Sequence, residues 1–389
     1  MRILMPPFPG NLRLRTSRSL TVMQERAALP ACTSANRYRD PRSSRAMAAC
    51  WRAVMSAIVI TGARGYIGSA LAGKLTCDGQ ALRLVSRSTA APRLETMRAA
   101  NVKHCAADLR KPQDWSRLLD GASAVIHLSS RTDLRAAEAD PVGDHVLNVE
   151  PVYALVRAAE DCRTTVSVIF ASSTSIVGNA HANPVDENTP DRPCSVYDRH
   201  KLECEMILEE ATRRGVLKAC ALRLPTVYGY SVGVASSNPN RGILNTMIRR
   251  AASGQALTVY GEGKYIRDYI FIQDVVDAFC RALSSDPVRN GKHYVIASGC
   301  GCTLAESFRY VAREAYRLTG HAIEVRHVPE PPDLHPIERS DFIGDASLFR
   351  KLTGWTPRFD LQSGIRHYFE QLVHEPAAVR GEDCPRQRP

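Results

Sequence analysis

AIVITGARGYIG, residues 57–68, is the stretch that decides the fold of this chain. Its short apolar run, typical of a buried parallel strand, leads directly into three glycines, and a helical pattern follows over residues 69–75. In such a unit Gly62 can take the tight turn, Gly65 lets the backbone approach a pyrophosphate, and Gly68 lets the helix pack on the strand. The N–H groups at the start of the helix then face the anion. The stretch therefore predicts dinucleotide binding, with NAD or NADP as the cofactor.

Strand-like and helix-like segments alternate from this stretch to about Leu224. The further expected strands are residues 82–85, 102–107, 124–128, 166–170 and 219–224, with a helix expected at 148–160. Such alternation predicts an α/β fold, a doubly wound parallel (Rossmann) sheet with ligands at the carboxyl ends of its strands. The hydroxyls of Ser172 and Ser173, which follow the fifth strand, are therefore expected at the same crevice as the glycine turn.

Polar residues at the ends of the second and third strands bear on the choice of cofactor. The second strand ends in Ser86 and Arg87 and lacks the carboxylate that would hold the ribose hydroxyls of NAD. Serine and arginine can instead accept a 2′-phosphate, which favours NADP or a relaxed preference; alternatively, Arg87 is simply solvated. Asp108, after the third strand, is a candidate for contact with the adenine amino group.

Tyr197 and Lys201 stand four residues apart in the pattern Y-x-x-x-K. Residues 201–214 contain no Gly or Pro and have helical spacing, and on a helix the two side chains share one face. A phenol has an ordinary pKa of about 10, but a neighbouring ammonium favours the phenolate, so the pair can exchange a proton near neutral pH. The alternative is an ordinary surface Tyr and Lys on an amphipathic helix.

The net charge of +11 is concentrated at the beginning of the chain. Residues 1–54 hold ten arginines against Glu25 and Asp40, a net +8, which leaves +3 for the other 335 residues. No basic face is implied for the body of the protein, so nucleic acid is not expected as a partner. We interpret residues 1–54 as a disordered Arg-rich extension or a mistaken start upstream of Met55.

The sequence shows no secretory signal, no apolar run long enough to span a membrane, and no C-x-x-C or metal-finger spacing among its 12 cysteines. We therefore expect a cytoplasmic protein with reduced thiols, no bound metal and no membrane contact. Residues 55–229 are expected to form the dinucleotide-binding domain and residues 230–375 a smaller substrate-binding lobe. Residues 254–283 of that lobe are expected to return to the first domain, and residues 376–389 to form a tail.

Several ordered motifs resemble the extended short-chain dehydrogenase/reductase family, in its NAD-dependent epimerase/dehydratase branch that acts on nucleotide sugars. The matching segments include TGARGYIGSAL (61–71), VIHLSS (125–130), ASSTSIVG (171–178), SVYDRHK (195–201), LRLPTVYG (222–229), GEGKYIRDYIFIQDVVDA (261–278) and LTGWTPRFDLQSGI (352–365). The resemblance covers about residues 56–372 and implies a NAD(P)-dependent enzyme.

The resemblance also implies roles for individual residues. Tyr197 would be the acid/base, Lys201 its electrostatic partner and ribose anchor, and Ser173 the hydroxyl that orients the reacting oxygen. The implied cofactor contacts are Gly62, Gly65, Tyr66, Ile67 and Gly68 at the pyrophosphate, Ser86, Arg87, Asp108 and Leu109 towards the adenosine, and Leu128, Ser129, Asn148 and Pro225 around the ribose and nicotinamide. Thr226, Arg267 and Arg339 would join Ser173 in binding the substrate, with the two arginines gripping its diphosphate. For Arg339 the alternative is a loop salt bridge.

Departures from the family pattern narrow the expected chemistry. Thr174 and Ser175 stand where dehydratases of this branch carry an Asp-Glu pair, and the glutamate of the decarboxylases is missing too, so dehydration is not expected. We predict a nucleotide-sugar epimerase, similar to UDP-glucose 4-epimerase, that works by reversible hydride transfer at a sugar carbinol. An NADPH-dependent reductase of a keto-sugar or another carbonyl and a non-catalytic dinucleotide-binding protein are the alternatives. Relatives often pair through two long helices, which predicts a homodimer built on the helices of Asn148 and Tyr197.

Overall fold

A computed structural model of the chain describes residues 56–87, 100–161, 165–179, 184–231, 242–332 and 334–373. The expected extension at residues 1–54 and the expected tail at residues 376–389 lie outside these described residues.

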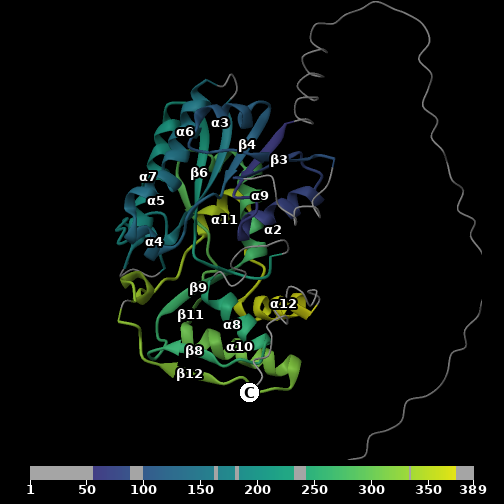
Figure 1. Cartoon of the computed structure of the whole chain (residues 1–389), viewed down its shortest axis with the longest axis vertical. Coiled ribbons are helices and arrows are strands. Elements are labelled where there is room, and N and C mark those ends of the chain that lie inside the picture. Colours follow the sequence, from purple (N-terminus) through teal and green to yellow (C-terminus); the bar gives the residue numbers. More distant parts are fainter. Residues whose placement is uncertain are drawn as a thin grey trace, which may run out of the picture. The chain divides into compact units, whose positions relative to one another are not determined.

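A parallel sheet of seven strands forms the main layer of the molecule (Figure 1), in the order β10-β6-β5-β4-β1-β2-β3. Its strands are β1 (Ala57–Thr61), β2 (Leu82–Ser86), β3 (Val102–Ala106), β4 (Ala122–His127), β5 (Val166–Ser173), β6 (Leu217–Leu224) and β10 (His293–Val295). All of their pairings are parallel, which confirms the predicted doubly wound Rossmann fold. The strand order changes direction between β1 and β4, and in such sheets ligands bind at this point, outside the carboxyl ends of the strands.

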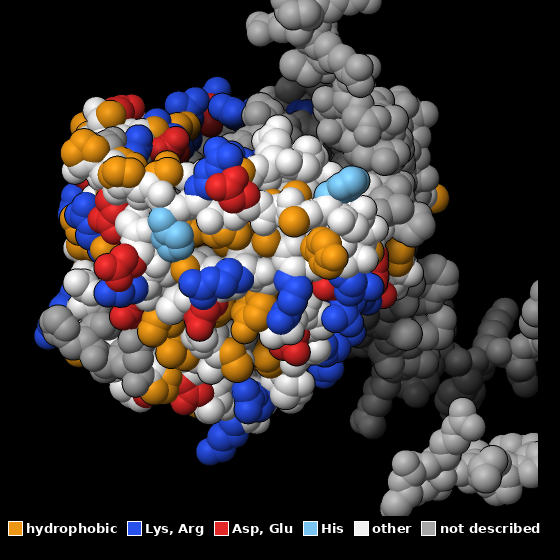
Figure 2. Space-filling view, turned by 90° about the horizontal axis from the view of Figure 1, so that it is seen from below, with side chains coloured by type: hydrophobic (Ala, Val, Ile, Leu, Met, Phe, Trp, Pro, Cys, Tyr) orange, Lys and Arg blue, Asp and Glu red, His pale blue; other side chains and the backbone are white. Residues whose placement is uncertain are grey.

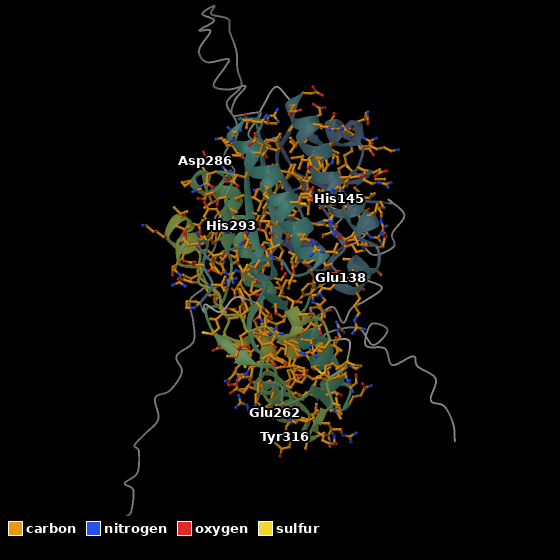
Figure 3. The ribbon with its side chains drawn as sticks, turned by 90° about the vertical axis from the view of Figure 1, so that its left-hand side faces the viewer. Glu138, His145, Glu262, Asp286, His293 and Tyr316 are labelled. Carbon is orange, nitrogen blue, oxygen red and sulfur yellow. The ribbon has the colours of Figure 1, made fainter. Side chains whose placement is uncertain are left out.

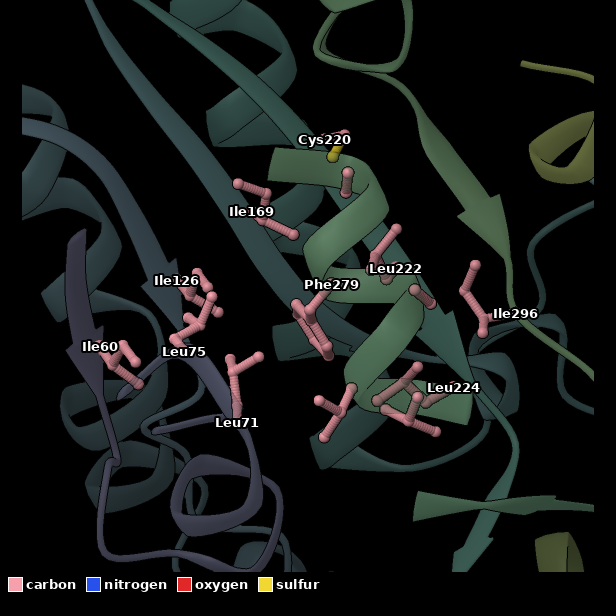
Figure 4. Packing of buried hydrophobic residues seen from close by; sticks show 14 of the residues in the cluster. Ile60, Leu71, Leu75, Ile126, Ile169, Cys220, Leu222, Leu224, Phe279 and Ile296 are labelled. Atoms are coloured by element: carbon pink, nitrogen blue, oxygen red, sulfur yellow. The ribbon is translucent and has the colours of Figure 1, made fainter. Parts of the chain in front are cut away.

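Helices cover both faces of the sheet because successive strand residues point to opposite sides. Helices α2 (Tyr66–Cys77) and α9 (Ile272–Ser284) pack on the face that buries Ile58 and Ile60, with Phe279 of α9 completely buried there (Figure 4). Helices α3 (Pro112–Leu119), α6 (Glu150–Glu160) and α7 (Val196–Arg213) pack on the opposite face, which buries Val59. Each fully buried large apolar side chain contributes about 1.5–3 kcal/mol to folding.

The structure corrects two local expectations beside the site. The helix expected at residues 148–160 begins at Glu150, as α6, and Asn148 belongs to the preceding helix, α5 (Pro141–Asn148); Pro151 lies in the first turn of α6, where its missing N–H costs nothing. Asn148 therefore ends one helix instead of beginning another. The strand expected at residues 166–170 continues to Ser173, because β5 pairs with β6 as far as Ser173 opposite Leu224.

The smaller lobe is built on two short sheets. Strands β7 (Thr226–Tyr228), β9 (Ile266–Phe271) and β11 (Gly301–Thr303) form one, and β8 (Leu257–Tyr260) pairs with β12 (Val325–Val328) in the other. Helices α8 (Ile243–Ala252), α10 (Leu304–Thr319) and α12 (Leu361–Val373) surround them, and their buried residues form a third hydrophobic cluster. Glu262 and Tyr316 lie at the end of this lobe away from Glu138 of α4 (Leu134–Ala139) and His145 of α5 (Figure 3).

Late segments of the chain complete the main sheet. Strand β10 pairs with β6, and α11 (Ser347–Thr353) packs against β10. Within residues 254–283, which were expected to return to the first domain, α9 packs on the main sheet, whereas β8 and β9 belong to the sheets of the lobe. Strand β10 and helix α11 are the later elements that return. On the face of the lobe in Figure 2, Lys and Arg side chains are interspersed with Asp and Glu, so that face is not uniformly basic.

Candidate active site

The glycine turn between β1 and α2 presents bare backbone at the switch point of the sheet. Gly62 has a positive φ of 62°, and its backbone carbonyl accepts the N–H of Gly65 at 2.8 Å. A Cβ on Gly68 would come within 2.2 Å of the Gly62 carbonyl oxygen, so the helix packs on the turn as the sequence predicted. Gly65 caps α2 without a side-chain hydrogen bond. A dinucleotide pyrophosphate fits this arrangement, because the first N–H groups of the helix are not covered by a capping side chain.

Tyr66 and Ile67, which were expected to contact the pyrophosphate, also hold the start of α2 in place. The Tyr66 hydroxyl donates to the carbonyl oxygen of Gly229 at 2.7 Å, and the Ser231 hydroxyl donates to the Tyr66 carbonyl at 3.0 Å. Ile67 packs against the buried cluster beneath the sheet. The glycine turn is thus tied to the segment after β7, where the chain enters the smaller lobe.

Two residues expected to contact the adenosine already form hydrogen bonds within the protein. The Asp108 carboxylate accepts two hydrogen bonds from Arg110, each at 2.8 Å, and this contact lowers its pKa to about 2. The Leu109 carbonyl accepts the indole N–H of Trp115 at 2.7 Å. An adenine contact at Asp108 would therefore share a carboxylate already paired with Arg110.

Strand β2, as far as the structure describes this part of the chain, ends without a carboxylate. Ser86 is the last residue of the strand, and Arg87 follows with its side chain exposed. This end of the strand is compatible with a 2′-phosphate and equally with a solvated arginine.

The turn after β4 lies against the glycine turn. Thr61 Oγ1 accepts the N–H groups of Leu128 and Ser129 at 3.1 and 3.2 Å. The Thr61 hydroxyl hydrogen is then available to Nδ1 of His127 at 2.9 Å. Because Nδ1 accepts this hydrogen bond, the hydrogen of the neutral imidazole lies on Nε2. Burial, and to a smaller extent the charge of Lys201, lowers the His127 pKa to about 3, so this imidazole is neutral.

Asn148 organises the loop beyond Ser129. Its side-chain oxygen accepts the Arg131 N–H at 2.7 Å and the Ser130 hydroxyl at 3.1 Å, and its amino group donates to the Arg131 carbonyl and to Asp144. Every hydrogen-bonding position of this buried amide is therefore in use within the protein. Asn148 can shape the wall of a nicotinamide site through the loop that it holds.

Lys201 lies between Tyr197 and the carboxyl end of β5. Its ammonium donates to the Ala171 carbonyl at 2.8 Å and lies 4.6 Å from the ring centroid of Phe170 and 5.7 Å from that of Tyr197. The side chain is buried, and a cation in such surroundings interacts strongly with a nearby phenolate. Helix α7 carries both residues of the predicted pair, and it packs against β5 and the short η2 helix (Thr174–Val177) that follows Ser173.

A cavity of about 220 Å³ opens beside Ser173. It is lined by Ser173, Thr174, Ser175, Gly178, Leu224, Pro225, Thr226, Arg267, Ile337, Glu338, Ser340 and Phe342. The structure thus brings Ser173, Pro225, Thr226 and Arg267 together, as the resemblance implied. Ile337 and Phe342 were missed, because only the folded chain carries their segment to the end of β5.

The two predicted arginines have different surroundings. Arg267 reaches the cavity wall with its guanidinium donating to the carbonyl oxygens of Ser340 and Glu338, and burial lowers its pKa. Arg339 is not among the residues lining the cavity; its side chain pairs with Glu330 at 3.2 Å. The loop salt bridge that was the alternative for Arg339 is therefore present.

Two buried polar networks near the site were not found from the sequence. Arg223 of β6 pairs with Glu205 of α7 and with Asp191, which lies in the loop leading to Tyr197. Asp198, next to Tyr197, accepts hydrogen bonds from Ser175 and Ser195. A charged residue inside an apolar strand, as in LRLP, is the signal that could have predicted the first network.

Neither a metal centre nor a membrane span is found in the part of the chain that the structure describes. No group of three or more His, Cys, Asp or Glu side chains there is placed to hold a metal ion. No described helix combines the length and the apolar character needed to cross a bilayer.

Comparison with known proteins gives consistent matches. A model of the NAD dependent epimerase/dehydratase family matches residues 58–297. UDP-glucose 4-epimerase of Mycolicibacterium smegmatis is 27% identical over 314 residues, covering 79% of this chain and 95% of that protein. The crystal structure of UDP-glucose 4-epimerase from Thermotoga maritima with UDP-glucose has a TM-score of 0.71 at 23% identity, covering 82% of this chain and 99% of that one. The NAD complex of the Thermus thermophilus UDP-glucose 4-epimerase has a TM-score of 0.69 at 23% identity, covering 82% and 100%.

Proposed function

This chain belongs to the NAD-dependent epimerase/dehydratase family, and from that premise we propose that it is a nucleotide-sugar epimerase similar to UDP-glucose 4-epimerase. It is an enzyme of the extended short-chain dehydrogenase/reductase type. The observation that carries the proposal is the position of the Lys201 ammonium, between the Tyr197 ring and the end of the strand that carries Ser173 into the cavity.

The dinucleotide site is proposed at the glycine turn. The missing side chains of Gly62, Gly65 and Gly68 let the turn and the start of α2 pack closely on the backbone around them, so that the first N–H groups of the helix face the proposed pyrophosphate site. Tyr66 and Ile67 hold the start of α2, and Leu128, Ser129 and Pro225 are proposed to border the reactive end. A nicotinamide dinucleotide held there would supply reversible hydride transfer at the sugar carbinol.

The protein's own residues handle the proton and the position of the sugar. Tyr197, as the phenolate favoured by Lys201, removes the carbinol proton, and Ser173 hydrogen-bonds the same oxygen. Thr226 and Arg267 border the cavity beside Ser173 and are proposed to contact the nucleotide sugar. Arg339 would reach a diphosphate only by leaving Glu330. An epimerase consumes no cofactor, because the keto-sugar turns over and takes the hydride back on its other face.

The test is an assay of the purified protein on a panel of UDP-, dTDP- and GDP-sugars, with and without added NAD or NADPH. We expect interconversion of one epimer pair without stoichiometric cofactor use, and at least a 100-fold loss of kcat in Tyr197→Phe, a value of about the size associated with a general acid/base. A Tyr197→Phe variant with near wild-type kcat would refute the scheme.

A net reductase is the second candidate, favoured by Ser86 and the exposed Arg87 at the end of β2. It would take NADPH as its cofactor and would consume one NADPH for each keto-sugar or other carbonyl reduced. The same panel separates the two functions, because only the reductase oxidises NADPH in proportion to product.

We also propose that two copies pair through α5, α6 and α7. Four large apolar side chains on these helices are exposed: Val142 (76%), Leu147 (40%), Tyr153 (44%) and Met206 (61%). Burying them against a second copy would remove this apolar area from water. The cysteines that the structure describes are free thiols, which fits a reducing compartment such as the cytoplasm.

A further inference from the structure

A chain of three side chains connects Ser173 to a buried carboxylate. The Oγ atoms of Ser173 and Ser175 are 2.7 Å apart, and the Ser175 hydroxyl donates to Oδ1 of Asp198. The other carboxylate oxygen, Oδ2, accepts the Ser195 hydroxyl at 2.6 Å. The Asp198 side chain is completely buried, whereas Ser175 and Ser173 both line the cavity, so within the described structure these two hydroxyls connect the carboxylate to the cavity.

Counting hydrogens fixes the direction of this chain. An ionised carboxylate can only accept, so Ser175 must give its single hydroxyl hydrogen to Asp198. In the hydrogen bond between the two serines, Ser173 must then be the donor and Ser175 the acceptor. Ser173 in that state offers only lone pairs to a ligand and cannot donate to a ketone oxygen.

A neutral Asp198 reverses the direction. Its O–H donates to Ser175, Ser175 donates to Ser173, and the Ser173 hydrogen is released towards the cavity. The keto form produced in the proposed reaction has no hydrogen on its oxygen and needs donors from the protein. Tyr197 in its phenol form is one such donor, and Ser173 is the second only when Asp198 holds a proton.

We propose that Asp198 is a positioning residue that acts through Ser175 and sets whether Ser173 can donate a hydrogen bond to the reacting oxygen. This role rests on the proposed function, because it concerns the same reacting oxygen. Asp198 must hold its proton throughout the hydride transfer, so that Ser173 donates to the oxygen of the alcohol and of the ketone alike and the carbinol proton passes only to Tyr197. If Asp198 were ionised, Ser173 would instead compete with Tyr197 for the carbinol hydrogen.

The surroundings of Asp198 allow both protonation states. Burial raises its pKa, while the hydroxyls of Ser175 and Ser195 and the backbone N–H of Ser195 favour the anion. His335, beside the η4 helix (Pro336–Arg339), also favours the anion when charged. Burial raises the pKa of the Cys194 thiol, and the nearby carboxylates of Asp198 and of Glu138 on α4 raise it further.

The first experiment measures the connection without any turnover. Protein labelled with ¹³C at the Asp carboxyl carbon is titrated by NMR, and the Asp198 signal is identified as the one absent from Asp198→Asn. Ser175→Ala removes a donor to the anion and should move the Asp198 midpoint upward by about one pH unit, the size of a lost hydrogen bond to a charged group. Ser173→Ala, which lies one side chain further along the chain, should move the same midpoint by a smaller amount through Ser175. An unmoved midpoint in both variants overturns the proposal.

The second experiment uses the reaction. In the wild type, the rate of the keto-sugar reduction step should fall at high pH with the Asp198 midpoint, because ionisation takes the Ser173 donor away. Asp198→Asn presents an amide N–H₂ group to Ser175, so this variant should still catalyse the reduction step. The rate of that step should no longer fall at high pH. Ser175→Ala should also lose the fall at high pH, because Ser173 then has no Ser175 oxygen to donate to and can donate to the ketone whether or not Asp198 is ionised. An unchanged fall at high pH in Asp198→Asn would overturn the proposal.

Failure of this inference and failure of the proposed function give different results. If the wild type interconverts no nucleotide sugar and the NMR midpoints still move, the connection stands and the assigned reaction is wrong. If the wild type is an epimerase and the midpoints do not move, the reaction stands and Asp198 has no role in it.

Discussion

Replacing Glu205 by glutamine is expected to destabilise the protein strongly, because Glu205 neutralises a buried arginine. Arg223 is only 1% exposed, and its guanidinium donates to the Glu205 carboxylate at 2.6 and 3.0 Å. Burial works against this charge, yet the contacts with Glu205 and Asp191 raise the pKa of Arg223 above its ordinary value. Removing one partner of a buried ion pair costs about 3–5 kcal/mol, and we expect a loss near the lower figure because Asp191 remains bound.

The assay is urea unfolding of wild type and Glu205→Gln, with the free energy of unfolding taken from midpoint and slope. Glu210→Gln is the matched control, because Glu210 lies on the same helix and pairs with Arg213 at the surface. Exposed pairs contribute little, so this control should unfold close to wild type. The double variant Glu205→Leu with Arg223→Met should lose less stability than Glu205→Gln, because it leaves no buried charge unpaired; Asp191, which loses Arg223, has a partly exposed side chain. Equal midpoints for Glu205→Gln and Glu210→Gln would refute the reasoning.

Three further results are expected. Gly68→Ala should lower the amount of dinucleotide that remains bound through purification and should cost about 1–3 kcal/mol of stability. The reason is that the new Cβ would meet the Gly62 carbonyl at 2.2 Å. An unchanged amount of retained dinucleotide would contradict this. His127 has a folded pKa of about 3 against an ordinary 6.5, so the unfolded chain binds more protons between these values and stability should fall with falling pH there. Urea unfolding is measured at several pH values between 4 and 6. For each unit by which the pH is lowered, the free energy of unfolding should fall by about 1.4 kcal/mol more in the wild type than in His127→Phe. Equal slopes of this free energy against pH would contradict the prediction. Met206→Glu should turn a dimer into a monomer in light scattering, whereas Leu318→Glu, on α10, should leave the dimer intact; a dimer that survives Met206→Glu would exclude this helix face.

Features encoded within a few neighbouring residues could be predicted from the sequence. The glycine turn is one, since β1, the turn and α2 are contiguous, and the parallel sheet is another, since its strands alternate with helices. The Tyr197 and Lys201 pair lies on one helix as its spacing required. Short-range patterns therefore sufficed for the main sheet and for the proposed cofactor side of the site.

Features that depend on distant partners could not be predicted in the same way. Whether Arg339 faces a ligand or Glu330 is decided by how the loop folds, and no local pattern specifies it. No local pattern indicates that Asp198 is buried, because its carboxylate is enclosed by a contact with Ser175, 23 residues earlier. The three residues of β10 were not assigned to the main sheet, because β6, their partner, lies about seventy residues away in the sequence.

The place of β10 has a consequence for how the protein is made on the ribosome. Strand β6 borders β5 on one side and β10 on the other, so its second edge stays open until residues 293–295 have emerged. During that interval a nascent chain presents unpaired N–H and C=O groups along a long apolar strand, a surface prone to pair with another chain. Chaperone capture during synthesis should therefore concentrate on chains that end between β6 and β10.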